Sequence, residues 1–557
     1  MSDNVNQEAR SSIFPNRAVY LLAFIFVMMG VVNSTPLIPG WDEFWRSVTG
    51  INNLKVRSFS TEWFYPLVFT LMMTVVALKH SMWRAWQGTS KASFGAFMDF
   101  ALVIAAAAVS FTYLIEIDSV CLIDLLNGER ARIMAETLRA EIEFAETMGL
   151  PKPDTVEDPK CISTTGVWLV AIMGCALIIF LGYNIKVWGL PLVAISLCIA
   201  AYTIITVLVW YFHGPDDINK YYMTKLGGEP RSFLDGVPNV HDALVNNASG
   251  FLGRFMHVIM NVVFPYIILG ALFGKSAGGR TLIKLAFRWT RRLRGGPAHA
   301  AIVSSAMFGT ITGGPVVNVL STGVLTIPMM IQRGFSRVFA GGMEAAASSG
   351  GSIMPPVMGV AAFILAAMTG VPYRDVIIAA TLPALAYFLC LFLSASFQSR
   401  KQGIEAFGAL TEDMRISGKD ILHLCQILLP ILLILLLLLT PKDMVGCGVF
   451  ATLLGAESVL QDDRCVVQSL PWFLQIFQNA AGDAGATGWW AAAFVTVLLF
   501  LDKDFRAQPG RLLDALAESG ITISSLYLMF LAVTVIDVCL NFTGLSKFVA
   551  IDVLRFL

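Results

Sequence analysis

The sequence predicts an all-α protein that crosses a membrane many times, and its composition and apolar runs carry this prediction. Of 557 residues, 56% are hydrophobic and only 14% are charged, whereas a soluble protein carries about a quarter charged residues. The mean hydropathy is +0.69. The formal net charge is zero, so nothing indicates a nucleic-acid partner.

Apolar runs long enough to form membrane helices recur along the whole chain. The uninterrupted runs that we expect to be helical are 18–32, 63–78, 97–115, 166–183, 190–212, 251–273, 375–397, 420–439, 489–501 and 520–540. Residues 1–17 are polar, and no small-residue cleavage site follows the first apolar run. We therefore expect this run to be retained as a signal-anchor helix.

The basic residues predict how the chain is oriented in the membrane. Residues 275–294 contain no acid and seven bases: Lys275, Arg280, Lys284, Arg288, Arg291, Arg292 and Arg294. The positive-inside rule places this segment in the cytoplasm. Counting helices backwards puts residues 1–17 in the cytoplasm and the loop 116–164 outside. Counting forwards puts the loop 441–483 outside.

Two further apolar segments are broken in the middle by small, polar and helix-breaking residues. The segment 299–332 is interrupted at Thr310–Pro315, and the segment 338–369 is interrupted at Ser348–Ser352. Basic residues flank the first segment on both sides, so we expect a re-entrant hairpin with its tip near Gly313 and Gly314. The second segment is then expected to cross outwards as a broken helix.

Such breaks point to a binding site. Non-helical backbone at membrane depth persists only where it is buried in protein or lines a polar cavity. Free carbonyl groups suit a small hard cation, and the N-termini of half-helices suit a carboxylate. A pair of broken helices is therefore typical of a secondary transporter. The alternative is a pair of kinked helices that pack closely through glycine.

Other polar signals are weaker. Glu344 precedes Ser348 by four residues and could act as a coupling or gating group. We favour the alternative that it lies near the cytoplasmic end of its helix, where it reaches water or pairs with Arg333 or Arg337. Neither the histidines nor the cysteines show the spacing of a metal site, and no catalytic arrangement is present, so we do not expect an enzyme.

The nine cysteines divide between loops and helices. Cys447 and Cys465 bracket a short stretch of one predicted external loop, and Cys121 and Cys161 bracket another. An external compartment permits disulfides. We predict at least the Cys447–Cys465 bridge, because a short loop closes at low entropic cost. The remaining cysteines should stay reduced: Cys175, Cys198, Cys390, Cys425 and Cys539.

From about residue 247 to 400 the chain resembles the large membrane subunit of the tripartite ATP-independent periplasmic (TRAP) transporters. The matching stretches are FRWTRRLRGGPAHAAIVSSAMFGTITGGPVVNVLSTGVLTIPMM and FAGGMEAAASSGGSIMPPVMGVAAFILAAMTGVPY. The sequence IMPPVMG followed by AAF resembles the TAXI branch, in which the small and large membrane subunits are fused. The helices before residue 247 fit that fused small subunit in number and placement.

The resemblance implies an elevator-type transporter in a bacterial inner membrane. It would import an organic acid with a periplasmic solute-binding protein, use a sodium or proton gradient, and need no organic cofactor. Carried over by position, the family's substrate and ion site maps to Thr310, Thr312, Gly313, Gly314, Asn318, Thr322, Ser348, Ser349, Gly350, Gly351 and Ser352. Ser348, Ser349 and Asn318 are expected to face the hairpin tip across a small cavity suited to sodium.

The family builds its site from two inverted repeats, whereas here no second glycine-broken hairpin follows Gly544. We expect a cytoplasmic segment 1–17, small-subunit-like helices 18–183, a first repeat 184–440, and a loop with the start of a truncated second repeat 441–557. A second polypeptide could supply the rest. The alternatives are a transporter or antiporter that works without a binding protein, and a remnant that does not transport.

Overall fold

The computed structural model describes residues 2–50, 56–116, 135, 138–145, 167–213, 250–406, 416–461 and 464–556. These residues form helices together with one two-stranded sheet, which confirms the predicted all-α polytopic class. Within the described residues, ten helical spans are long and apolar enough to cross a membrane: Arg17–Ser34, Thr61–Ala85, Ala92–Ile115, Ala171–Trp188, Leu190–Val209, Arg254–Lys275, Tyr373–Lys401, Gly418–Leu439, Ala484–Leu501 and Gly510–Thr543.

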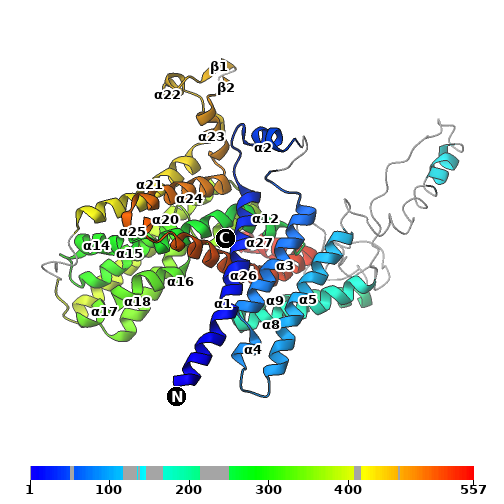
Figure 1. The fold of residues 1–557 in the computed structure, drawn as a ribbon, viewed down its shortest axis with the longest axis horizontal. Coiled ribbons are helices and arrows are strands. Elements are labelled where there is room, and N and C mark those ends of the chain that lie inside the picture. Colours follow the sequence, from blue (N-terminus) through cyan, green and yellow to red (C-terminus); the bar gives the residue numbers. More distant parts are fainter. Residues whose placement is uncertain are drawn as a thin grey trace. The chain divides into compact units, whose positions relative to one another are not determined.

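The chain divides into two compact units. The first unit comprises residues 1–22, 59–257 and 521–557, and the second comprises residues 23–58 and 258–520. Helices α1 (Ser2–Ser34) and α26 (Gly510–Thr543) each contribute residues to both units. Figure 1 labels these two helices and most of the other elements named below.

The first unit is built mainly on membrane helices. Its elements are α3 (Thr61–Lys79), α4 (Met82–Ala85), α5 (Ala92–Glu116), α8 (Val167–Trp188), α9 (Leu190–His213), α12 (Arg254–Val258), residues 521–543 of α26, and α27 (Leu545–Phe556). Polar side chains join them across apolar faces. Asn184 of α8 donates to the Leu528 carbonyl of α26 at 2.8 Å, and Ser196 of α9 donates to the Ala532 carbonyl at 3.1 Å. Buried polar groups of this kind need such partners.

The second unit contains both broken segments. Its elements between residues 259 and 401 are the π-helix η2 (Ile259–Val263), α13 (Phe264–Lys275), α14 (Gly278–Thr290), α15 (Gly296–Thr312), α16 (Pro315–Asn318), the π-helix η3 (Val319–Gly323), α17 (Val324–Gln332), α18 (Arg337–Gly350), the 3₁₀ turn η4 (Gly351–Ile353), α19 (Val360–Thr369) and α20 (Tyr373–Lys401). An apolar core packs α15, α17, α18 and α20 together through residues that include Ala301, Ile302, Met330, Ala347 and Phe388.

The remaining elements of the second unit are α2 (Trp41–Thr49), α21 (Gly418–Leu439), α24 (Ala484–Leu501), α25 (Lys503–Arg506) and a small subdomain between α21 and α24. The basic segment is mostly the amphipathic helix α14, which buries apolar residues such as Leu282 and Phe287. Two lysines of this basic segment form ion pairs: Lys284 with Asp420 at 3.0 Å, and Lys275 with Glu518 at 2.6 Å.

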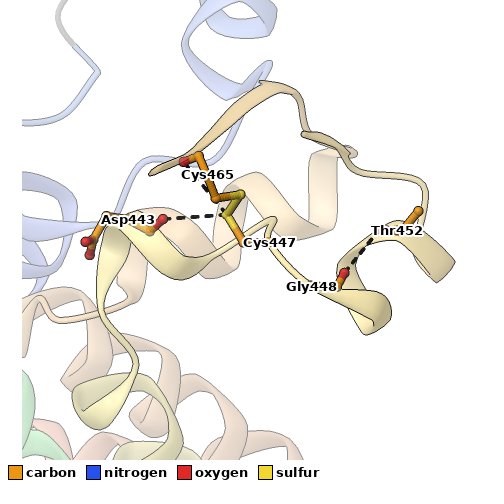
Figure 2. The surroundings of a disulfide bond; sticks show 5 residues. All are labelled: Asp443, Cys447, Gly448, Thr452 and Cys465. Carbon is orange, nitrogen blue, oxygen red and sulfur yellow. Dashed lines mark hydrogen bonds between the residues drawn. A yellow bond between two sulfur atoms is a disulfide. The ribbon is translucent and has the colours of Figure 1, made fainter. Parts of the chain in front are cut away.

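The small subdomain carries a disulfide. It consists of the 3₁₀ turn η6 (Lys442–Met444), α22 (Val449–Leu453), the antiparallel strands β1 (Glu457–Gln461) and β2 (Arg464–Ser469), and α23 (Trp472–Ala480). Figure 2 shows Cys447, just before α22, bonded to Cys465 of β2. Cys121 and Cys161 lie outside the described residues. The other cysteines are free thiols.

Helix lengths differ from the sequence prediction at several ends. Helix α1 begins at Ser2, well before the apolar run that starts at residue 18, and α26 begins at Gly510 instead of 520. Hydropathy marks only the apolar part of a helix, whereas each polar residue added to the end of an existing helix costs little, because the helix is already nucleated. The run 251–273 is interrupted by the π-helix η2, which comes just before Pro265. Proline lacks the N–H that an unbroken α-helix would use there.

Candidate functional site

The first broken segment folds as a helical hairpin. Helix α15 ends at Thr312, Gly313 turns the chain with a φ of 58°, and α16 starts at Pro315. The returning limb continues through η3 and α17 to Gln332. Positive φ favours glycine at position 313. Space demands it as well, because a Cβ atom there would lie 1.7 Å from the Met358 carbonyl oxygen.

The helix of the second broken segment is interrupted where it packs against this hairpin. Helix α18 ends at Gly350, η4 follows, and residues 354–359 run without helical structure until α19 begins at Val360. The Gly359 N–H donates to the Ser352 carbonyl at 2.6 Å. The Tyr373 hydroxyl of α20 donates to the carbonyl of Pro356 at 3.1 Å and also to that of Val357. Local and neighbouring donors thus satisfy part of the exposed backbone.

Glycines let the two segments touch backbone to backbone. A Cβ atom on Gly309 of α15 would lie 2.3 Å from the Gly351 Cα atom, and one on Gly351 would lie 2.8 Å from the Asn318 side-chain nitrogen. A Cβ atom on Gly350 would likewise lie 2.4 Å from the ring of Tyr387 on α20. By contrast, a Cβ atom on Gly314 would meet nothing closer than 3.7 Å. Gly309, Gly350 and Gly351 therefore act through close packing.

Behind this contact lies a fully buried carboxylate. Glu344 of α18 has 0% exposure. Its Oε1 atom accepts hydrogen bonds from Ser305 at 3.1 Å, Thr322 at 2.5 Å and Ser348 at 3.2 Å. Its Oε2 atom accepts one from Thr326 at 2.5 Å. Four hydroxyl groups from α15, from the return limb of the hairpin and from α18 thus converge on one side chain, and we call this set the Glu344 cluster.

The favoured sequence interpretation of Glu344 is wrong. We expected it to reach water or to pair with Arg333 or Arg337, but within the described residues its partners are hydroxyl groups and it forms no ion pair. The expectation failed because it considered only the positions of the nearest arginines in the sequence. The hairpin limb, which is remote in sequence from α18, covers that face of the helix.

The structure brings together part of the predicted site. Asn318, Thr322 and Ser348 lie in or beside the Glu344 cluster: Asn318 donates to the Ser305 carbonyl at 2.9 Å, and its Oδ1 atom lies 3.4 Å from the Thr322 hydroxyl. Ser349 is exposed. The Ser352 hydroxyl donates to the Ser349 carbonyl at 2.7 Å. Ser349 and Ser352 are therefore not part of the cluster.

The two threonines at the hairpin tip bond to their own helix. Thr310 donates to the Met307 carbonyl at 2.7 Å, and Thr312 donates to the Phe308 carbonyl at 3.2 Å. Two residues of the cluster, Ser305 and Thr326, were missed by the sequence prediction. A signal for Thr326 was available, because it follows Thr322 by four residues and so shares a helix face with it. Ser305 had no comparable signal.

Charged and titratable side chains on the helices that pack around the cluster include several with partners elsewhere. His299 of α15 bonds to the Gly295 carbonyl at 3.1 Å and to Ser396 at 2.9 Å. Tyr387 of α20 donates to the Ala346 carbonyl at 2.9 Å, and Lys284 of α14 pairs with Asp420. Arg337, at the start of α18, is exposed. The Glu344 cluster is thus an oxygen-rich centre whose one charged member is an acid.

Comparison with known proteins gives one family match and several relatives. Residues 181–556 match the family described as "Tripartite ATP-independent periplasmic transporter, DctM component". The chain is 30% identical over 145 residues to the isethionate TRAP transporter permease protein DctMQ of Oleidesulfovibrio alaskensis, which is 26% of this chain and 22% of the relative. It is 26% identical over 140 residues to the C4-dicarboxylate TRAP transporter large permease protein DctM of Vibrio cholerae, which is 25% of this chain and 30% of the relative.

An uncharacterized protein, y4mL of Sinorhizobium fredii, is 28% identical over 196 residues, which is 34% of this chain and 46% of that protein. The chain thus spans less than half the length of each of these relatives.

Proposed function

Because the chain belongs to the DctM component family of the tripartite ATP-independent periplasmic transporters, we propose that it imports an organic acid as the membrane permease of such a system. The family match makes it a multi-pass membrane permease component of a transporter, and not an enzyme. The proposal adds a TAXI-type system with fused small and large subunits, located in a bacterial inner membrane with the N-terminus in the cytoplasm.

The proposed substrate class and partner draw on the relatives. Two of them carry isethionate and C4-dicarboxylates in their names, and both kinds of molecule are small organic anions. A periplasmic solute-binding protein is the partner that the family implies. The membrane helices that precede the matched region, including α1, α3 and α5, support the fused small subunit.

One observation supports transport above the others: the turn of the hairpin packs into the break of the second helix. Gly313 and the Met358 carbonyl meet there at a distance that admits only glycine. Two segments with broken backbone packed together in a membrane unit are typical of a secondary-transport site. Simple kinked helices would not require both breaks to lie at the same place.

The proposed driving force is an ion gradient, with sodium ahead of protons. Asn318 and Ser348 lie beside the contact between the segments and carry the oxygen atoms that a hard cation prefers. In this proposal sodium binds between the hairpin and the broken helix and so stabilises their association. The organic acid then binds next to the same backbone break.

Alanine substitution tests the site. Asn318→Ala and Ser348→Ala, introduced at the chromosomal locus of the host that makes the protein, should reduce sodium-dependent uptake of labelled organic acids by about tenfold or more. Isethionate and C4-dicarboxylates belong in the panel. Ser349→Ala is the matched control, because this neighbouring serine lies outside the cluster, and its uptake should equal that of the parent. Parental uptake in both site variants, at equal membrane levels, would refute the assignment.

A further inference from the structure

We infer that the Glu344 cluster is itself a cation site, in which Glu344 provides the charged ligand for an ion of the size of sodium. This inference rests on the proposed ion-coupled transport, and it adds to that proposal the residue that neutralises the ion. It also names two ligands, Ser305 and Thr326, that the family resemblance did not supply.

The first argument is the spacing of the oxygen atoms. The Ser305 and Thr322 hydroxyls are 3.2 Å apart, each lies within 3.1 Å of Glu344 Oε1, and the Ser348 hydroxyl lies 3.2 Å from the same atom. The Asn318 Oδ1 atom extends this set at 3.4 Å from Thr322. Oxygen ligands about 2.4 Å from a common ion and at right angles to one another lie about 3.4 Å apart. The 3.1 and 3.2 Å distances need to grow by only a few tenths of an ångström to hold such an ion, whereas the 2.5 Å distance from Thr322 to Glu344 Oε1 needs to grow by about 0.9 Å.

The second argument concerns where the hydroxyl hydrogens can go. A hydroxyl group that binds a cation turns its lone pairs to the ion and needs another acceptor for its hydrogen. Thr322 has such an acceptor in the Asn318 carbonyl at 2.8 Å, and Thr326 has one in the Thr322 carbonyl at 3.0 Å. These hydroxyl groups can donate either to Glu344 or to their own helix. The same shell can therefore surround a bare carboxylate or a carboxylate with its cation.

The third argument is electrostatic. A carboxylate buried in a membrane protein is costly unless a charge of opposite sign compensates it. Lys, Arg and His side chains among the described residues do not pair with Glu344. Hydroxyl groups supply dipoles but no net charge. A bound cation would neutralise the buried carboxylate where the hairpin packs against the broken helix, which is the state best suited to moving through a hydrocarbon layer.

Glycine leaves room for this carboxylate. A Cβ atom on Gly323 of η3 would lie 3.1 Å from Glu344 Cγ and 3.3 Å from Ile327 Cδ1. The π-helical turn at η3 places Gly323 and Thr322 side by side facing Glu344, so the return limb can approach α18 closely. The sequence thus places the large side chain of Glu344 on α18 and a glycine, which has no side chain, opposite it.

Sodium binding to the purified full chain tests the inference without any substrate. Radioactive sodium is titrated onto the protein in detergent, with choline chloride replacing sodium chloride at constant ionic strength. The parent should bind sodium, and Glu344→Gln should bind it at least about tenfold more weakly. Glu518→Gln is the matched control, since it makes the same chemical change in a partly exposed ion pair with Lys275, and it should bind sodium as the parent does.

Equal sodium binding by the parent and Glu344→Gln would overturn the inference. It would also be overturned if the parent bound no sodium while its infrared spectrum showed a carboxylic acid band that is missing from Glu344→Gln, because Glu344 would then bind protons. If Glu344→Gln does not fold, Glu344→Asp and Thr322→Val replace it. Each alters one ligand and should weaken sodium binding, and unchanged binding in both would overturn the inference.

The two proposals can fail separately. Normal uptake in the Asn318 and Ser348 variants contradicts the transport site, whatever the Glu344→Gln protein binds. Parental sodium binding in Glu344→Gln contradicts only the role of Glu344.

Discussion

Each of the two units contains a carboxylate surrounded by hydrogen-bond donors, but the donors are of different kinds. In the first unit, Asp99 of α5 accepts from the backbone N–H groups of Met82 at 2.7 Å and Trp83 at 3.2 Å, as well as from Ser81 and Tyr183. In the second unit, Glu344 accepts from hydroxyl groups. A backbone N–H group has a fixed direction and cannot become an acceptor, whereas a hydroxyl group can turn.

This difference assigns different roles to the two acids. Asp99 satisfies the N–H groups at the start of α4 and holds that turn against α5, which is a capping role. Basic groups also lie close to it, since Lys186 donates to the Ser81 carbonyl at 2.7 Å. Glu344 has a shell that can be rearranged and no basic partner among the described residues. Asp99 is half-buried and Glu344 is fully buried, and it is the kind of donor around each acid that distinguishes their roles.

The largest expected effect comes from Gly313→Ala, which should separate the hairpin from the broken helix. The new Cβ atom would lie 1.7 Å from the Met358 carbonyl oxygen, in a backbone conformation with a φ of 58°. We expect a loss of stability of about 4 kcal/mol or more, measured as a lower thermal unfolding midpoint, together with loss of sodium binding. Gly314→Ala is the control, with its nearest neighbour at 3.7 Å. A stable Gly313→Ala protein that binds sodium normally would contradict the close contact.

A smaller effect is expected from Thr326→Val, which keeps the shape of the side chain but removes the donor to Glu344 Oε2. Leaving a buried acceptor without its partner costs about 1–3 kcal/mol, so the unfolding midpoint should fall when sodium is absent. Thr381→Val on α20 is the control, because in the part of the chain that the structure describes this hydroxyl bonds to its own helix, at the Ile377 carbonyl. Equal midpoints for the two variants would show that the donor to Glu344 adds nothing.

The smallest effect is expected from Asp99→Asn, which retains an acceptor for the N–H groups of α4 but weakens the cap. We expect a loss of about 1 kcal/mol and sodium binding equal to that of the parent. Thermal unfolding and the sodium titration measure the two quantities on the same preparation. Reduced sodium binding in this variant would remove the distinction between the two acids.

The hydropathy pattern alone determined the class of the protein and the positions of its membrane helices. Desolvating a polar backbone is so costly in hydrocarbon that apolar length nearly dictates a helix there. Glycine, serine and proline also marked both broken segments, because these residues change local backbone preferences whatever surrounds them. Their positions in the sequence agree with the turn at Gly313 and the break after Gly350.

Only the tertiary structure decided which polar side chains meet. Ser305 lies on α15 and Thr322 and Thr326 lie on the return limb, and packing of the hairpin against α18 brings these three to Glu344 and Ser348. Ser349 follows Ser348 directly, yet one is exposed and the other is buried. Neighbouring residues on a helix point about 100° apart, so the contact between helices determines which of the two serines is buried. The local sequence determines where a helix breaks. Packing between residues that are far apart in the sequence determines which side chains lie around the break.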